Sequence, residues 1–112
     1  IRLGLNKIKT TKWDYSFVVT EYGSPIFRSF EIKNNKLSMF YPEKFKERSQ
    51  DLPKAYHDAG QFYWGRVVAW DAGLPILPNA VGYEIDAKRA IDIDTEDDWI
   101  RAEILHAAKR LI

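Results

Sequence analysis

The chain has no cysteine among its 112 residues, which excludes disulfides, cysteine-ligated zinc and thiolate catalysis. It also has almost no net charge, with 17 Lys and Arg against 16 Asp and Glu, so the overall charge makes no electrostatic case for binding to nucleic acids or acidic membranes. No apolar run approaches the length of a membrane span, and no signal-peptide pattern is present. We therefore expect a soluble, cytoplasmic protein with neither a nucleic-acid nor a membrane partner.

Common catalytic signatures are missing as well. The sequence contains no GxGxxG, GxxxxGK, GxSxG or HExxH pattern. The residues therefore do not indicate a dinucleotide site, a P-loop, a nucleophile elbow or a zinc-protease helix. The chain starts at Ile1 rather than at a methionine. We expect it to be part of a longer protein, in which another segment holds any nucleotide phosphates.

Hydrophobic periodicity predicts an α/β domain. The run Phe17, Val18 and Val19 is typical of a strand buried on both faces. Asn34 and Asn35 indicate a hairpin turn, because asparagine tolerates the left-handed conformation. The expected elements are a helix at residues 1–8, a strand at 15–20, hairpin strands at 26–32 and 37–41, a loop or short helix at 42–55, a strand-like aromatic run at 60–65, a short helix at 66–72, strands at 81–86 and 90–94, and a helix at 95–112. The last helix has an apolar stripe, which consists of Ile100, Ile104, Ala107, Ala108 and Leu111.

The hairpin interrupts the alternation of helices and strands, so we interpret residues 26–41 as an inserted arm within a single partial domain, residues 1–112. The arm carries Phe27, Phe30, Met39, Phe40 and Tyr41, which are side chains that must pack on a neighbour. Packing on the arm's own domain and packing on a second subunit both remain open.

The most distinctive polar pair is Asp92 and Asp94, each flanked by isoleucine. In a strand, alternation places both carboxylates on one face. Thr95 is suited to cap a following helix, with Asp98 completing a capping box. Carboxylates at the C-terminal end of a strand lie where α/β sheets bind ligands, and their oxygens suit magnesium. A metal site and a plain helix cap both fit this pattern.

A second polar cluster precedes and enters the aromatic run. His57 has Asp58 beside it and Arg48 nearby, so it could bind an anion or act as an acid or base. It could equally be a solvated loop histidine. The aromatic run between Gly60 and Gly65 would set polar groups beside flat apolar walls, as a sugar or base pocket requires.

Three motifs together resemble one enzyme family. They are RSQDL at residues 48–52, YHDAGQFYW at 56–64 and DIDTEDDW at 92–99. In this order and spacing they resemble the C-terminal half of the acylneuraminate cytidylyltransferases, or CMP-sialic acid synthetases. The HDAGQFYW run is most similar to the pseudaminic acid cytidylyltransferase branch.

The resemblance implies the C-terminal part of a three-layer α/β nucleotidyltransferase fold with the hairpin as a dimerisation arm. It implies a homodimer and an Mg2+-dependent reaction, in which a nine-carbon sugar acid attacks the α-phosphate of CTP and pyrophosphate leaves. The family's glycine-rich N-terminal loop, which binds CTP, has no counterpart in these residues. We therefore expect the 112-residue chain to be inactive alone.

The resemblance also assigns roles to individual residues. Asp92 and Asp94 match the family's catalytic, metal-binding aspartates. Arg48 and Gln50 match a cluster that holds the sugar acid, with the arginine suited to its carboxylate. His57 and Gln61 match positions that line the sugar pocket. Much of the sialic-acid branch has a second arginine where this chain has Ser49, which bears on the choice of sugar acid more than on the reaction.

Two other functions remain open. One is a nucleotide-sugar glycosyltransferase, whose Asp-x-Asp motif also binds a metal and a sugar nucleotide. The other is a non-catalytic dimerisation module, in which the hairpin is the interface and the aspartates only cap a helix.

Overall fold

The computed structural model describes residues 1–111, and they form two compact units. The first unit comprises residues 1–20 and the chain from residue 58 onward, and the second comprises residues 21–57. The predicted arm at residues 26–41 lies inside the second unit. The predicted C-terminal helix ends at Ile112, which lies outside the described residues.

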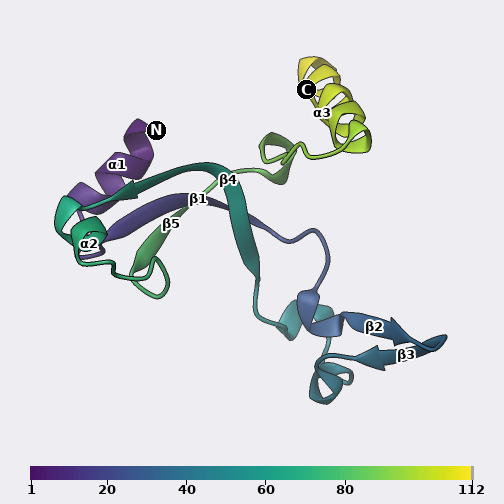
Figure 1. Cartoon of the computed structure of the whole chain (residues 1–112). Coiled ribbons are helices and arrows are strands. Elements are labelled where there is room, and N and C mark those ends of the chain that lie inside the picture. The colour runs from purple at the N-terminus through teal and green to yellow at the C-terminus, as the bar shows by residue number, and fades with distance from the viewer. Residues whose placement is uncertain (112) are drawn as a thin grey trace. The chain divides into compact units, whose positions relative to one another are not determined.

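Three strands form the sheet of the first unit, in the order β4-β1-β5 (Figure 1). They are β1 at Tyr15–Glu21, β4 at Tyr56–Gly65 and β5 at Ala80–Glu84. β1 and β5 are parallel, with Tyr15 opposite Ala80. The side chains of Phe17 and Val18, which alternate across the two faces of β1, are both buried. The predicted strand with two buried faces is therefore confirmed, in a sheet that is parallel on the β5 side.

The helices follow the predicted ranges closely. They are α1 at Arg2–Lys9, α2 at Val67–Asp71 and α3 at Glu96–Ala108, with 3-10 turns η1 at Ile26–Arg28, η2 at Pro42–Lys44, η3 at Ser49–Asp51, η4 at Ala87–Arg89 and η5 at Lys109–Leu111. α2 ends where predicted, because Gly73 after it adopts a left-handed φ of 65°. No helix within the described residues is long and apolar enough to cross a membrane.

Arg66 joins the end of β4 to the segment between α1 and β1. Its backbone N–H donates to the Asp14 carbonyl at 2.9 Å, so the end of β4 lies beside the start of β1 and the two strands are antiparallel. Its guanidinium donates to the carbonyls of Ile8, Thr11 and Trp13 at 2.7, 3.0 and 3.2 Å. A single side chain thus binds the carbonyls of Thr11 and Trp13 and supplements the long 3.5 Å bond that the Ile8 carbonyl accepts from the Thr11 N–H.

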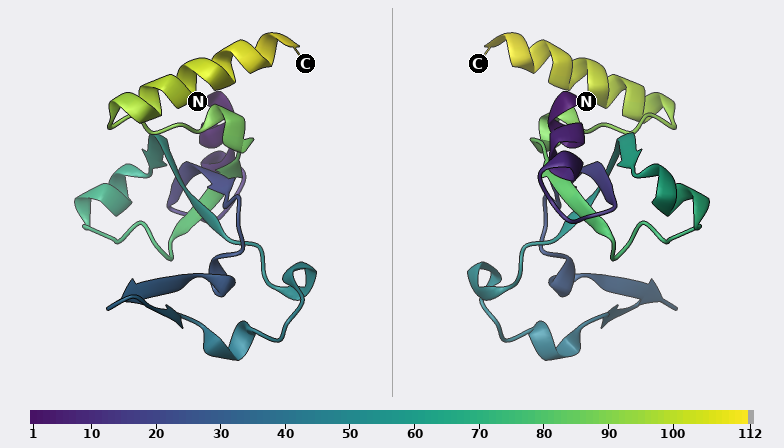
Figure 2. Two further views of the ribbon diagram at one scale, coloured as in Figure 1. Left: turned by 90° about the vertical axis from the view of Figure 1, so that its right-hand side faces the viewer. Right: turned by 90° about the vertical axis from the view of Figure 1, so that its left-hand side faces the viewer.

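The second unit contains the hairpin, with β2 at Phe30–Lys33 and β3 at Lys36–Met39 (Figure 2). Its turn uses positive φ angles of 50° and 63° at Asn34 and Asn35, as predicted. The strand predicted at residues 26–29 is wrong, because Pro25 is followed by the turn η1. The register places Phe30 opposite Met39 and Ile32 opposite Leu37, so these four apolar side chains share one face of the ribbon.

The strand predicted at residues 90–94 is also wrong. These residues have no regular secondary structure and connect η4 to α3. A strand needs a neighbour to take its backbone hydrogen bonds, and the sheet of the described residues ends at β5. The alternation survives in part, because Ile91 and Ile93 line a hollow of about 630 Å³ together with Ala102 and Leu105 of α3.

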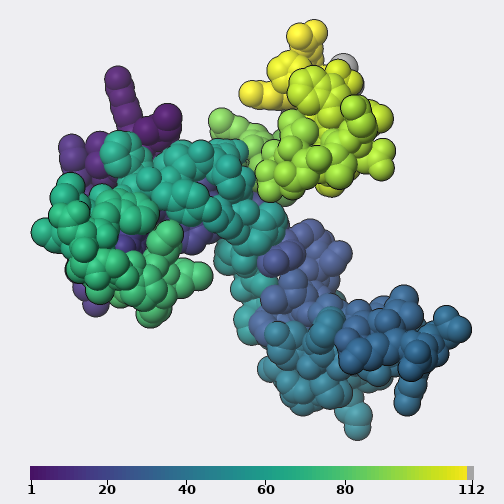
Figure 3. All heavy atoms as spheres, viewed as in Figure 1, coloured from purple at the N-terminus to yellow at the C-terminus, as the bar shows by residue number. Residues whose placement is uncertain are grey.

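α3 exposes to solvent the two isoleucines of its predicted apolar stripe. Ile100 and Ile104 are 49% and 61% exposed, whereas Ala102 and Leu105 on a neighbouring face are half-buried. The space-filling view shows the side chains of this helix, in yellow-green, standing out on the face in view (Figure 3). The sequence therefore identified the helix correctly and its buried face incorrectly.

Candidate functional site

The Asp92–Asp94 segment joins a capped helix start. The Asp98 carboxylate accepts hydrogen bonds from the backbone N–H groups of Asp94 and Thr95 at 3.1 and 3.0 Å. The Thr95 hydroxyl accepts one from the Asp98 N–H at 3.1 Å. The predicted capping box is confirmed. The bonds from Asp94 and Thr95 hold the pKa of the Asp98 carboxyl below its ordinary value, because they stabilise its charged form.

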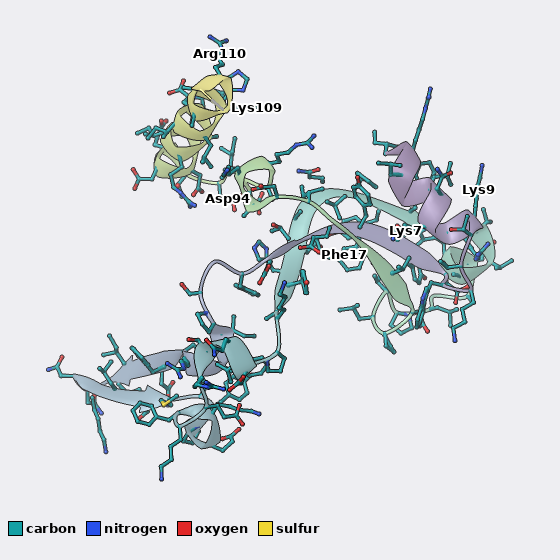
Figure 4. All side chains as sticks on the ribbon, turned by 180° about the vertical axis from the view of Figure 1, so that it is seen from behind. Lys7, Lys9, Phe17, Asp94, Lys109 and Arg110 are labelled. Carbon is teal, nitrogen blue, oxygen red and sulfur yellow. The ribbon has the colours of Figure 1, made fainter. Side chains whose placement is uncertain are left out.

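Asp94 lies in the connection before α3, at the end of the helix opposite to Lys109 and Arg110 (Figure 4). It lines an open hollow of about 510 Å³ with Thr95, Glu96 and Trp99. Within the described residues, no group of three or more acidic or histidine side chains could hold a metal ion by itself. Two exposed carboxylates suit magnesium, which keeps several waters and binds through one or two carboxylates plus substrate phosphates. The two carboxylates therefore fit a cation whose remaining ligands are water molecules and a phosphate of the substrate.

The other end of the segment contacts β4. The Gln61 side chain donates from Nε2 to the carbonyl of Arg89 at 2.8 Å, and Arg89 is the last residue of η4. Of the six predicted site residues, Gln61 is therefore connected to the segment that carries Asp92 and Asp94. No sequence pattern indicates this contact, because the two residues lie 28 positions apart.

An Asp-x-Gly pattern shapes β4 just before Gln61. The Asp58 Oδ1 atom accepts a hydrogen bond from the Gly60 N–H at 2.8 Å, and Gly60 has a left-handed φ of 67°. The Tyr63 hydroxyl donates to the other oxygen of Asp58. This bond raises the pKa of the Tyr63 hydroxyl above its ordinary value, because ionisation would break it. This role of Asp58 was not predicted from the sequence, although an Asp two residues before a Gly is a known turn signal.

Arg48 and Gln50 lie together at η3 in the second unit. Arg48 forms an ion pair with Asp51, at 3.0 Å between Nε and Oδ2. Both side chains of the pair are mostly exposed, so the pair orients the guanidinium without burying it. Ser49, between the two predicted residues, lines a hollow of about 170 Å³ whose wall is formed by residues 21–26 and 52–55. Arg48 and Gln50 are thus placed beside a small cavity of their own unit.

His57 is half-buried and contacts an aromatic ring. Its imidazole lies 4.7 Å from the ring of Tyr22, at an interplanar angle of 58°. The two chain segments are also joined by a backbone hydrogen bond, since the Tyr22 N–H donates to the Ala55 carbonyl at 2.9 Å. The histidine is therefore oriented by packing and is not a freely solvated loop residue.

The six predicted site residues thus divide between the two units. Gln61, Asp92 and Asp94 belong to the first, and Arg48, Gln50 and His57 belong to the second. Side-chain contacts orient Gln61 in the first group, and Arg48 and His57 in the second. The metal and sugar-pocket roles of these residues stay predictions.

The relatives found by comparison with known proteins have names that include the word cytidylyltransferase. The chain is 40% identical over 94 residues to the pseudaminic acid cytidylyltransferase of Campylobacter jejuni subsp. jejuni, an alignment that covers 82% of this chain and 40% of that protein. It is 34% identical over 90 residues to a Helicobacter pylori protein named pseudaminic acid cytidylyltransferase and UDP-2,4-diacetamido-2,4,6-trideoxy-beta-L-altropyranose hydrolase, covering 80% of this chain and 17% of that one.

A vertebrate relative has a related name. The chain is 31% identical over 101 residues to N-acylneuraminate cytidylyltransferase B of Danio rerio, which covers 85% of this chain and 23% of that protein. No protein-family model matches the chain. The chain spans 40% of the length of the Campylobacter jejuni relative. Over at least 80% of its own length, it is homologous to part of the pseudaminic acid and N-acylneuraminate cytidylyltransferases, the family that its motifs resemble.

Proposed function

We propose that this chain forms the metal-binding and sugar-binding part of a cytidylyltransferase that transfers CMP from CTP to a nonulosonic acid, with pseudaminic acid as the first candidate. One observation carries the proposal: a chain 40% identical to a pseudaminic acid cytidylyltransferase holds the backbone of Asp94 at a capped helix start. The carboxylates of Asp92 and Asp94 are the proposed magnesium ligands.

Each proposed role follows from the chemistry of a side chain. Magnesium, when bound, supplies positive charge that offsets the charge of the phosphates and favours ionisation of the attacking hydroxyl. Asp92 and Asp94 hold that charge at the start of α3. Arg48 offers a planar fork for the carboxylate of the sugar acid, and its ion pair with Asp51 limits the orientations of the fork. Gln50 and His57 offer hydrogen bonds to the same ligand.

The hairpin is the proposed dimerisation arm. Phe30, Ile32 and Leu37 on its apolar face are 54%, 72% and 59% exposed, whereas Glu31 and Ser38 alternate onto the opposite face. A two-stranded ribbon is only marginally stable alone in water, and an exposed apolar face of this kind marks an interaction surface. The proposed partner is the same face of a second copy, which gives a two-fold symmetric contact.

A chimera tests the proposed function without assuming where the natural protein begins or ends. The matched segment of the Campylobacter jejuni relative is replaced by the corresponding residues of this chain. We expect pyrophosphate release that requires both CTP and the sugar acid, with pseudaminic acid and N-acetylneuraminic acid compared as acceptors. The 112-residue chain alone is the control and should release none. A chimera that has the relative's circular dichroism and melting temperature but shows no sugar-dependent release contradicts the proposal.

A further inference from the structure

The Asp92–Asp94 segment is irregular, so something other than a sheet must fix it. At its downstream end, the Asp98 carboxylate accepts hydrogen bonds from the N–H groups of Asp94 and Thr95. At its upstream end, Gln61 donates to the Arg89 carbonyl at 2.8 Å. Hydrogen bonds therefore hold the segment at Arg89, three residues before Asp92, and at Asp94. Residues 90–93 connect these two points.

The upstream anchor is rigid on the side of Arg89. Asp86 Oδ1 accepts a hydrogen bond from the Lys88 N–H at 2.9 Å, and the Asp86 carbonyl accepts one from the Arg89 N–H at 2.9 Å. The Ala87 carbonyl accepts a further bond from the Ala90 N–H at 3.2 Å. Gln61 thus holds a closed turn, and movement of that turn would carry Asp92 with it.

The anchor is also fixed on the side of Gln61. Gly60 before it is held in the left-handed region by the bond to Asp58, whose second oxygen accepts from Tyr63. A Cβ atom at Gly60 would meet no atom within 4 Å, so glycine is required there for its backbone conformation and not for space. This local kink in β4 sets the direction of the Gln61 side chain toward η4.

We infer that Gln61 is a positioning residue, which acts through the Arg89 carbonyl to hold Asp92 and Asp94 where a magnesium ion binds. The inference rests on the proposed function, because it takes the two aspartates as metal ligands. It differs from the role implied by the family resemblance, in which Gln61 lines the sugar pocket. The Nε2 atom of that amide instead donates to the protein backbone.

Amide hydrogen exchange in the 112-residue chain tests the anchor directly. Gln61→Met keeps the length of this exposed side chain and removes its N–H donor. We expect exchange at Arg89 and Ala90 to become about fivefold faster, the effect of losing one hydrogen bond. Exchange at Asp94 and Thr95 serves as the internal reference, since Asp98 still holds those amides. Unchanged exchange at Arg89 and Ala90 overturns the inference.

A titration with magnesium chloride, followed by the amide shifts of residues 91–95, tests the positioning role. We expect Gln61→Met to bind magnesium about tenfold more weakly than the wild type, the usual effect of removing a group that orients metal ligands. Asn6→Leu, which likewise removes an amide from an exposed position but on α1, should leave the affinity unchanged. Equal affinity of Gln61→Met and wild type overturns the inference. Failure of the wild type itself to bind magnesium is a failure of the proposed metal site, and it removes the inference as well.

Kinetics of the chimera separate the two roles of Gln61. A positioning role raises the magnesium concentration needed for half-maximal activity and leaves the KM of the sugar acid unchanged. A sugar-pocket role raises the KM of the sugar acid and leaves the magnesium requirement unchanged, and this result overturns the inference.

Discussion

Arg66 offers the sharpest test of how the first unit is held together. Its guanidinium donates to the carbonyls of Ile8, Thr11 and Trp13, and its side chain is 38% exposed. The substitution Arg66→Met keeps the apolar stem and removes every donor. The carbonyls of Thr11 and Trp13 then lose the guanidinium, whereas the Ile8 carbonyl keeps a bond from the Thr11 N–H at 3.5 Å.

The expected loss follows from these bonds. Each hydrogen bond to a charged group contributes about 1.5–3 kcal/mol, but bonds from one partly exposed group do not add in full. The ion pair with Asp14, at 4.0 Å, adds less than about 1 kcal/mol. We therefore expect Arg66→Met to lower the free energy of unfolding by about 2–4 kcal/mol, which moves the urea midpoint down by more than about 1 M.

Urea unfolding followed by tryptophan fluorescence measures this change. Arg2→Met removes the same atoms from an exposed position of α1 and is the matched control. Arg66→Lys should fall between wild type and Arg66→Met, because an ammonium group cannot reach three carbonyls as a planar fork does. Equal midpoints for Arg66→Met and Arg2→Met would refute the reasoning.

Three further predictions concern α3 and the hairpin. Thr95→Ala should lower the free energy of unfolding by about 1 kcal/mol through loss of the cap, and Thr95→Ser, which keeps the hydroxyl, should change it little; thermal unfolding measures both. The pKa of the Asp98 carboxyl is lowered in the folded chain. The stability contributed by its ionised form is therefore fully present above the unfolded pKa of about 3.9, and it is lost as the pH falls through the lower pKa of the folded chain. Helicity measured by circular dichroism should therefore decline in acid, and Asp98→Asn should be low in helicity already at neutral pH, with a smaller acid step. Ile32→Asp should convert the proposed dimer to a monomer in sedimentation velocity, whereas Ser38→Asp, with the same charge change on the other face, should not; a monomeric wild type contradicts the proposed arm.

The features that the sequence predicted correctly are those encoded by neighbouring residues. The apolar run Phe17 to Val19 needs no knowledge of its neighbours to indicate a buried strand, and the turn at Asn34 and Asn35 depends only on the conformations that asparagine tolerates. The capping box of Thr95 and Asp98 is likewise a pattern within four residues. Local physical preferences decide each of these structures.

The features that the sequence could not predict depend on distant partners. Ile91 and Ile93 alternate like a strand, but an extended connection alternates in the same way, and a strand also needs a neighbour to pair with. The stripe of Ile100 and Ile104 indicates which face of α3 could be buried, not whether a neighbour covers it. The bond from Gln61 to Arg89 joins two exposed polar residues across 28 positions, and no periodicity encodes such a contact.

The most direct test of the central claim compares two neighbouring aspartates in the chimera. Asp94→Asn and Asp97→Asn remove the same charge from exposed positions near the start of α3, but only Asp94 is a proposed magnesium ligand. Measured at saturating CTP and sugar acid across a magnesium titration, kcat should fall by about a hundredfold or more for Asp94→Asn. It should change by less than about threefold for Asp97→Asn, a surface substitution. Equal kcat values for the two variants at saturating magnesium would contradict the claim that Asp92 and Asp94 form the metal site.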